Sequence, residues 1–242
     1  MSDENQVLAI DAGNTSIKVG LFSNDELVEV RRFTITKLEE LKTWLVTLDQ
    51  SSSVLSSVLS TSDTKLVLAL LVNPLIVDHQ TKFPIELDYA TPDTLGIDRI
   101  CNAVYANKNS TSEYAVTIDI GTCIKFDLTN NGKYVGGSIA PGIELRYKSL
   151  NDYTGNLPLL SNKTVENLVG NSTNTSIQAG VMNGIQAELQ EMVQQYRSQF
   201  KDLTFFMTGG DASSFDIHSK NDIFADENLT LKGLYEIHKH NA

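Results

Sequence analysis

The sequence is poor in cysteine, and this scarcity excludes two classes of small protein. Its 242 residues include only Cys101 and Cys123, which cannot form the repeated pattern of a disulfide-rich secreted domain or a zinc module. The histidines also lack metal-ligand spacing to cysteines or carboxylates; they are His79, His218, His238 and His240. Two widely separated thiols suit a reducing compartment, so we expect a cytoplasmic protein.

Positive charge and long apolar runs are scarce as well. Lysine and arginine number 19 against 30 acidic residues, and the net charge of −11 argues against nucleic acid or an anionic membrane as a partner. The longest apolar run, 66–72, is far shorter than the roughly 20 residues of a membrane-spanning helix. Residues 1–6 are polar and acidic, so we expect no signal peptide. Anionic ligands must therefore be bound by local donors and cations.

A polar turn lies between two apolar runs near the amino terminus. The runs 7–10 and 17–22 have strand character. The polar residues between them are Asp11, Gly13, Asn14, Thr15 and Ser16. Glycine lets the backbone approach a ligand closely, and the side chains and amides of this turn can donate to phosphate oxygens. The alternative is an ordinary hairpin whose Asp and Asn serve the turn alone.

A second copy of this pattern favours ligand binding. Residues 114–126 again contain an apolar strand, then Asp119, Gly121 and Thr122, then a second apolar strand. Cys123 follows this turn and could be a nucleophile, but no base lies near it in the sequence, which favours plain packing. Two polar hairpins in similar halves can bind one nucleotide from two sides.

The duplication predicts two domains, 1–112 and 113–242, with a hinge near 107–113. Apolar residues make up 41% of the chain and prolines number only five, so both halves can bury a core. The layout resembles the superfamily of actin, sugar kinases and heat-shock ATPases. The expected fold is therefore α/β, with two ribonuclease H-like domains and a nucleotide cleft between them.

Apolar periodicity predicts further elements around the turns. A helix is expected over 36–48, with Thr36 and Glu39 as its capping box. Residues 51–62 favour a short strand, whereas 64–72 is ambiguous between helix and strand. The other expected strands are 26–33, 75–77, 83–87, 134–139, 203–208 and 223–225, and the other expected helices are 98–106, 143–150, 176–200 and 231–238. Pro141 is expected in the first turn of a helix, and 151–174 is expected to be a long polar loop.

One short motif at the start of a predicted helix suggests chemistry. Asp98 and Arg99 follow Gly96 in the first turns of this helix. The helix dipole favours the aspartate there but not the arginine, so capping alone does not explain the pair. A base that removes a proton and a cation for an acidic group would explain both residues.

Four motifs together resemble type III pantothenate kinase in their order and spacing, over nearly the whole chain. They are Asp11-x-Gly13-Asn14-Thr15-x-x-Lys18, Gly96-x-Asp98-Arg99, Asp119-x-Gly121-Thr122 and Gly136-Gly137-x-Ile139-x-Pro141-Gly142. The resemblance implies ATP-dependent phosphorylation of pantothenate at its primary hydroxyl, the first step of coenzyme A synthesis. It also implies a homodimer that uses Mg²⁺ with ATP and a monovalent cation, K⁺ or NH4⁺.

The resemblance also implies a role for each matched residue. The ATP site would contain Asp11, Ala12, Gly13, Asn14, Thr15, Ser16, Ile17, Lys18 and Thr122. Asp98 would take the hydroxyl proton, Asp119 would hold K⁺, and residues 136–142 would shape the adenosine side. The pantothenate pocket would contain Tyr89, Gly96, Ile97, Asp98, Arg99 and Thr173.

Two other function classes are alternatives. A kinase for another small acid or sugar would share the phosphate turns, but it would not explain the motif from Gly96 to Arg99. A non-catalytic accessory or regulatory relative would need no base at Asp98. The chain departs from the family pattern at Cys123, where a small residue such as alanine is usual; this change should leave the chemistry intact.

Overall fold

The first sheet is organised around β1 (Gln6–Ala12), whose apolar side chains are buried on both faces. The computed structural model describes residues 6–13, 16–48, 50–161, 163–217 and 222–242. β1 pairs antiparallel with β2 and parallel with β4, in the strand order β3-β2-β1-β4-β5. The other strands of this sheet are β2 (Ile17–Ser23), β3 (Glu26–Phe33), β4 (Gln50–Ser57) and β5 (Pro74–Ile76).

The chain forms two compact units. The first contains the residues up to Lys108 together with Gly132–Tyr134 and Asn228–Ala242, and the second contains Asn109–Asn131 and Val135–Glu227. These units differ from the domains expected from the sequence, because the carboxyl-terminal helix α6 (Leu229–Asn241) belongs to the first unit. That helix contacts β1, β2 and β4.

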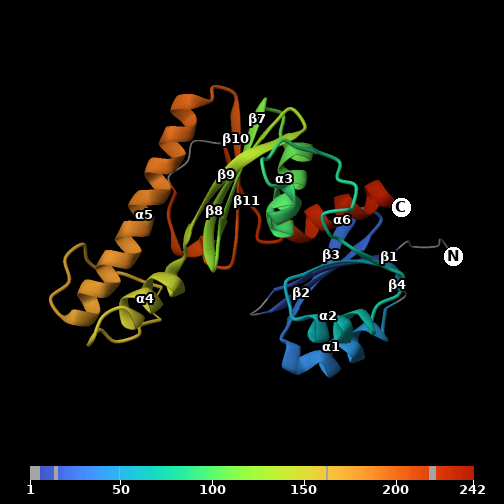
Figure 1. The fold of residues 1–242 in the computed structure, drawn as a ribbon, viewed down its shortest axis with the longest axis horizontal. Helices are drawn as coiled ribbons and strands as arrows, with labels where there is room; N and C mark the ends of the chain where they lie inside the picture. The colour runs from blue at the N-terminus through green and yellow to red at the C-terminus, as the bar shows by residue number, and fades with distance from the viewer. Residues whose placement is uncertain (1–5, 14–15, 49, 162, 218–221) are drawn as a thin grey trace. The chain divides into compact units, whose positions relative to one another are not determined.

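Alternation along β1 divides the core of the first unit into two layers. Leu8 and Ile10 belong to the layer that contains residues of α1 (Leu38–Leu45) and α2 (Thr61–Leu68). Val7 and Ala9 belong to the layer that contains residues of α3 (Ile97–Asn109) and of α6. The two pairs of helices cover opposite faces of the sheet (Figure 1). Because a shift of one residue would exchange the two sets of side chains, burial on both faces fixes the register of β1.

The second unit repeats the strand order of the first. Its strands run β9-β8-β7-β10-β11, with β7 and β8 antiparallel and β7, β10 and β11 parallel. Their bounds are β7 (Tyr114–Ile120), β8 (Cys123–Asn130), β9 (Lys133–Pro141), β10 (Leu203–Thr208) and β11 (Ile223–Ala225). In the first unit, the short β6 (Glu86–Leu87) pairs in parallel with Lys133 and Tyr134. The duplication expected from the two turns is therefore present in the strand order.

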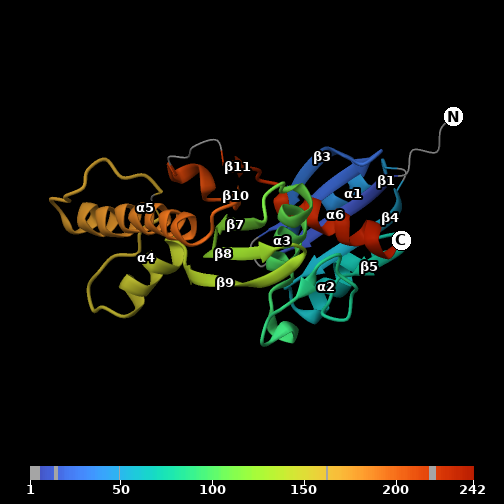
Figure 2. The same ribbon diagram turned by 90° about the horizontal axis from the view of Figure 1, so that it is seen from above.

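Two helices pack beside each other in the second unit (Figure 2). They are α4 (Ile143–Asp152) and α5 (Thr173–Gln199). α5 starts with a capping box between Ser172 and Thr175, and it buries the expected apolar stripe that includes Ile185 and Leu189. Three short 3-10 helices complete the described elements: η1 (Ile35–Lys37), η2 (Pro92–Thr94) and η3 (Ala212–Ser214).

Two local predictions need correction, and one ambiguity is resolved. Thr36 lies in η1, where its hydroxyl is 2.8 Å from that of Thr34, so the expected capping box with Glu39 is wrong. The ambiguous segment 64–72 supplies the end of α2, which is capped by Ser60 through the amide of Asp63. Pro141 ends β9, so it does not open the following helix.

The packing of α6 on α3 predicts an effect of a single methyl group. A Cβ at Gly233 would lie 1.9 Å from the carbonyl oxygen of Cys101, whereas a Cβ at Gly184 of α5 would meet nothing within 4 Å. We expect Gly233→Ala to lower the free energy of unfolding by about 1–3 kcal/mol or more, because the backbone at Cys101 or at residue 233 must move to admit the methyl group. The control Gly184→Ala should instead gain up to about 1 kcal/mol from helix propensity. Urea unfolding measures both, and equal stability of the two variants would contradict the packing.

Candidate functional site

The first polar turn joins β1 to β2. The strand register places Asp11 opposite Lys18 and Ala12 opposite Ile17. The amide of Gly13 donates to the carbonyl of Ser16 at 3.0 Å, which closes the loop. Ala12 and Ile17 are buried, whereas Asp11, Gly13, Ser16 and Lys18 are half-buried. The expected ligand residues Asn14 and Thr15 lie outside the described part of the chain.

Gly96 makes room for the carboxylate of Asp98. A Cβ at residue 96 would lie 2.5 Å from Asp98 Oδ1, so a side chain there would displace this oxygen. The carbonyl of Gly96 accepts the amides of Arg99 and Ile100 at 3.1 and 3.2 Å, which starts α3. Asp98 is half-buried in this first turn, where a negative charge is favoured by the helix dipole. The motif therefore holds one carboxylate at a helix start.

Arg99 is buried next to aromatic rings. Its side chain leaves the residue only 5% exposed, and its guanidinium carbon lies 5.9 Å from the ring centroid of Tyr134. Tyr89 contacts the same ring edge-on at 5.6 Å. Ile97 packs against the apolar core. Tyr134 thus links Arg99 to Tyr89, a role that sequence reasoning missed because residue 134 reads only as a strand residue.

Asp11 of the first turn and Asp98 of this motif both affect the pKa of one buried thiol, that of Cys101. Burial raises the pKa of Cys101 well above its usual value, and the negative charges of Asp11 and Asp98 raise this pKa further. Both carboxylates therefore lie within electrostatic range of the same side chain. The first unit thus brings together the aspartate of the turn and the aspartate of α3, which lie far apart in the sequence.

The second polar turn joins β7 to β8. Its register places Asp119 opposite Lys125, and the amide of Gly121 donates to the carbonyl of Cys123 at 3.1 Å. Asp119 Oδ2 lies 2.7 Å from Lys125 Nζ, and each of the two side chains is 14% exposed. Thr122 is exposed at the tip of the turn, where its hydroxyl is accessible to a ligand. In both turns, the strand register places an aspartate of the first strand opposite a lysine of the second strand.

Two further glycines enclose the second turn. The amide of Gly142 donates to the carbonyl of Thr122 at 3.0 Å, and a Cβ at Gly142 would lie 2.0 Å from the carbonyl oxygen of Gly121. Gly209 has a φ of +103°, and a Cβ there would lie 2.2 Å from the carbonyl oxygen of Ile120. Only glycine fits this close backbone approach. The turn is therefore held from both sides by backbone.

A lysine that the sequence did not single out lies beside the loop after β10. The Lys163 ammonium forms an ion pair with Asp211, which is buried and donates its amide to the carbonyl of Ile120 at 2.9 Å. Lys163 Nζ is also 3.8 Å from Glu144, and the pKa of Lys163 is raised mainly by its hydrogen bond to Asp211. Lys163 belongs to no motif and no apolar periodic pattern, so the sequence alone could not predict its contact with Asp211.

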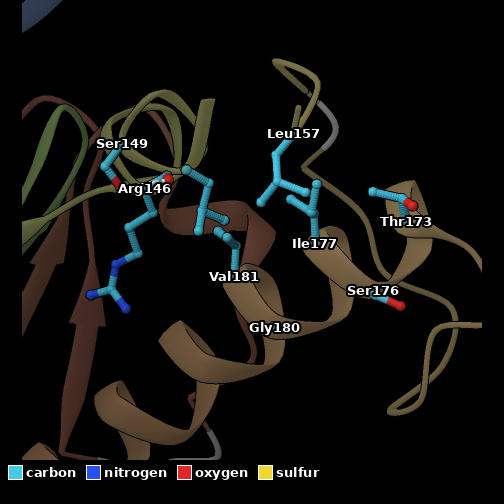
Figure 3. A pocket seen from close by; sticks show the side chains of 9 residues that line it. Arg146, Ser149, Leu157, Thr173, Ser176, Ile177, Gly180 and Val181 are labelled. Carbon is cyan, nitrogen blue, oxygen red and sulfur yellow. Dashed lines mark hydrogen bonds between the residues drawn. The ribbon is translucent and has the colours of Figure 1, made fainter. Parts of the chain in front are cut away.

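Two of the cavities in the second unit border residues predicted for the site. One, of about 740 Å³, lies between α4 and α5 and includes the predicted substrate residue Thr173, the first residue of α5 (Figure 3). Its walls include Ile177 and Val181, and Arg146 donates to Glu188 at 2.6 Å. The other, of about 370 Å³, is lined in part by Gly136 and Gly137 of β9 and by aromatic side chains of the α5 end. The predicted adenosine run thus borders a cavity.

No group of three or more histidine, cysteine, aspartate or glutamate side chains among the described residues gathers in a way that could hold a metal ion. Likewise, no helix within the described ranges is long and apolar enough to cross a membrane.

Two units with this strand order, each with an Asp-x-Gly turn after its first strand, define the fold of actin, sugar kinases and heat-shock ATPases. A protein from Campylobacter jejuni assigned to the Baf family of transcriptional activators has this fold, with a TM-score of 0.62, 22% identity and coverage of 97% of this chain and 98% of that one. A polyphosphate/ATP-glucomannokinase from Arthrobacter sp. strain KM has it with a TM-score of 0.50, 15% identity and coverage of 98% and 99%.

Sequence similarity then identifies the family. The family model described as type III pantothenate kinase matches residues 7–195. A type III pantothenate kinase from Christiangramia forsetii is 41% identical over 233 residues, which covers 94% of this chain and 95% of that protein. The chain belongs to the type III pantothenate kinase family, as its four motifs predicted.

The enclosure of the second turn predicts an effect on its backbone. We expect Gly142→Ala to push the carbonyls of Gly121 and Thr122 away and to speed amide hydrogen exchange across residues 119–123. Gly155→Ala is the control in the same unit, because a Cβ at Gly155 would meet nothing within 4 Å. Exchange followed by mass spectrometry tests both variants. Unchanged exchange in Gly142→Ala would show that the turn does not depend on this contact.

Proposed function

We propose that this chain transfers the terminal phosphoryl group of ATP to the primary hydroxyl of pantothenate, which yields ADP and 4'-phosphopantothenate and starts coenzyme A synthesis. The observation that carries the proposal is the Asp98 carboxylate, which Gly96 accommodates at the start of α3 beside buried Arg99, in a chain of this family. Neither a phosphate-binding relative nor a regulatory protein needs a carboxylate placed in this way.

The proposed phosphoryl transfer needs no reactant besides ATP and pantothenate. The hydroxyl oxygen of pantothenate forms a bond to the γ-phosphorus, and the bond from that phosphorus to the β,γ-bridging oxygen breaks, so ADP leaves with the electron pair. The proton of the hydroxyl passes to Asp98. Because phosphoryl transfer goes through a loose transition state, positioning and neutralisation of charge carry most of the catalysis.

ATP is proposed to bind at the two polar turns. Residues 11–18 bind the phosphates, with contacts from Asp11, Gly13, Ser16 and Lys18, and Ala12 and Ile17 belong to this site as the strand residues that flank the loop. The support for this division is that Ala12 and Ile17 are buried while the others are half-buried. Asn14 and Thr15 belong to the same proposal through the motif alone. Thr122 is a further contact, and residues 136–142 shape the adenosine side.

Pantothenate is proposed to contact Tyr89, residues 96–99 and Thr173. Arg99 supplies the positive charge for the acidic substrate group. Its burial supports this role, since a charge in a low-dielectric setting interacts more strongly than one in water. The contact of both Arg99 and Tyr89 with the ring of Tyr134 keeps the two side chains in one place. Thr173 borders an apolar cavity, which suits the methyl groups of pantothenate.

The proposed ions are Mg²⁺ with ATP and a monovalent cation, K⁺ or NH4⁺. Mg²⁺ in such enzymes is held largely by substrate phosphates and water, with one or two carboxylates, so a turn with the single carboxylate of Asp11 fits it. Asp119 is the proposed carboxylate for the monovalent cation. Because Lys125 Nζ is 2.7 Å from Asp119, K⁺ or NH4⁺ reaches this carboxylate only in competition with Lys125.

The chain is further proposed to act as a cytoplasmic homodimer. The second unit exposes large apolar side chains, among them Tyr153 at 89%, Leu168 at 80% and Val169 at 78%. A contiguous exposed apolar patch commonly marks an interface between subunits, and Leu168 and Val169 are adjacent in the chain. Cys101 and Cys123 are both free thiols, which suits the cytoplasm.

Release of ADP tests the proposed activity. The protein with ATP and Mg²⁺ should release ADP only when pantothenate is added, because the acceptor hydroxyl is required for transfer. A coupled assay with pantothenate, with a sugar in its place and with no acceptor measures this dependence. Release with the sugar but not with pantothenate would identify another kinase. No release from a folded protein would favour the accessory or regulatory relative.

The role of Asp98 gives a quantitative expectation. A general base contributes about 10²- to 10⁴-fold in rate, so Asp98→Asn should lower kcat by that order while the Kd of ATP stays within about twofold. Asp93→Asn is the matched control, because Asp93 lies just before the motif and is exposed. Steady-state kinetics and calorimetry give the two quantities. Wild-type turnover in Asp98→Asn would remove Asp98 from the mechanism.

A further inference from the structure

The ion pair between Asp119 and Lys125 is more enclosed than a typical surface pair. Both side chains are 14% exposed, whereas in the pair of Lys133 with Glu86 the exposures are 49% and 62%. Exposed pairs contribute little, but removal of one partner from an enclosed pair leaves a charge that neither water nor protein compensates. Lys125 is therefore the counter-charge on which the Asp119 carboxylate depends.

The strand register gives Lys125 the same place in the second unit that Lys18 has in the first. Asp11 lies opposite Lys18, and Asp119 lies opposite Lys125, in each case on the first two strands of the sheet. The spacing in the sequence hides this equivalence, because the loop of the first turn is one residue longer than that of the second. The motifs single out Lys18 but give no role to Lys125.

We propose that Lys125 is a tethered monovalent cation at Asp119 and supplies the positive charge that a free K⁺ or NH4⁺ would otherwise bring to the second turn. The inference rests on the proposed binding of ATP at this turn, and it replaces the free K⁺ or NH4⁺ proposed at Asp119 with the ammonium of Lys125. An alkylammonium carries the same charge as NH4⁺ and offers similar hydrogen-bond donors. Because it is tethered, its effective concentration at Asp119 is high, and a free ion must displace it to bind there.

The proposal predicts which variant needs a free cation. With Lys125→Met, the Asp119 carboxylate is left uncompensated near the bound phosphates, so nucleotide binding should depend on K⁺. In the wild type, the Kd of a non-hydrolysable ATP analogue with Mg²⁺ should differ by less than about threefold between potassium chloride and tetramethylammonium chloride of equal ionic strength. In Lys125→Met, the Kd should be at least about tenfold weaker in tetramethylammonium than in potassium.

Calorimetry on the full chain measures these constants, and thermal unfolding in the two salts reports the same ion binding without nucleotide. Lys125→Arg keeps the charge and should behave like the wild type. Lys133→Met removes a lysine from an exposed ion pair and should also show no dependence on K⁺. The double variant Asp119→Asn with Lys125→Met removes both charges and should lose the dependence again. If Lys125→Met does not fold, Lys125→Gln takes its place, with the same expected dependence on K⁺.

Two outcomes would overturn the inference. One is a wild type that binds the nucleotide only in potassium, with an unchanged cation dependence in Lys125→Met. The other is a folded Lys125→Met protein whose Kd is the same in both salts. Failure of the proposed function is distinguishable from both, because it appears as absence of ADP release with pantothenate from a protein whose nucleotide Kd is still measurable.

Discussion

The positions of the site residues depend on the burial of β1 and β7 on both faces. In β1, Leu8 and Ile10 are buried on one face and Val7 and Ala9 on the other, and in β7 residues 115–118 are all buried. A slip of one residue would bring each set of side chains to the wrong face, so the register of these strands is strongly specified. Each aspartate stands next to the last residue of its strand, and the packing that stabilises the sheet thereby places a carboxylate beside the turn.

Glycine then determines how closely other segments approach these positions. Gly96 leaves room for a carboxylate oxygen, Gly142 and Gly209 bring backbone against the second turn, and Gly233 brings α6 against α3. At each of these sites an added Cβ would lie within 2.5 Å of another atom. The position of the second turn is therefore set by main-chain contacts, whereas at Gly96 the close contact is with the side-chain oxygen of Asp98.

Much of the fold follows from local pattern. The strand β10 begins and ends at the residues of the predicted buried strand, and α5 buries the predicted stripe, because both signals come from neighbours in the sequence. The ambiguous segment 64–72 became the end of a helix through the cap at Ser60. By contrast, α6 joins the first unit through packing on β1, β2 and β4, and no property of residues 229–241 alone indicates that partner.

The residues of the candidate site also fall into two groups: those that local motifs predict, and those that only the fold brings into contact. The sequence identified Asp11, Asp98 and Asp119, because each belongs to a motif with glycine at fixed spacing. It could not show that Tyr134 packs on Arg99 or that Lys163 pairs with Asp211, since these contacts join segments far apart in the chain. From the sequence, Arg99 is predicted only as a cation that faces an anionic group. Its burial against an aromatic ring depends on a strand that follows it by some 35 residues, so the motif alone could not predict it.

Electrostatics connects these contacts to function. A chain with a net charge of −11 repels ATP and an acidic acceptor at long range, so its attraction for them must come from charges fixed close to the ligands. Three cations of the chain are ordered by contacts within it: Lys125 is held by Asp119, Lys163 by Asp211, and Arg99 lies on a ring. A side chain already ordered loses less entropy when a phosphate binds. Because phosphoryl transfer depends on placed charge more than on strong acids or bases, the positions of a few ordered cations can matter more than the net charge of the surface.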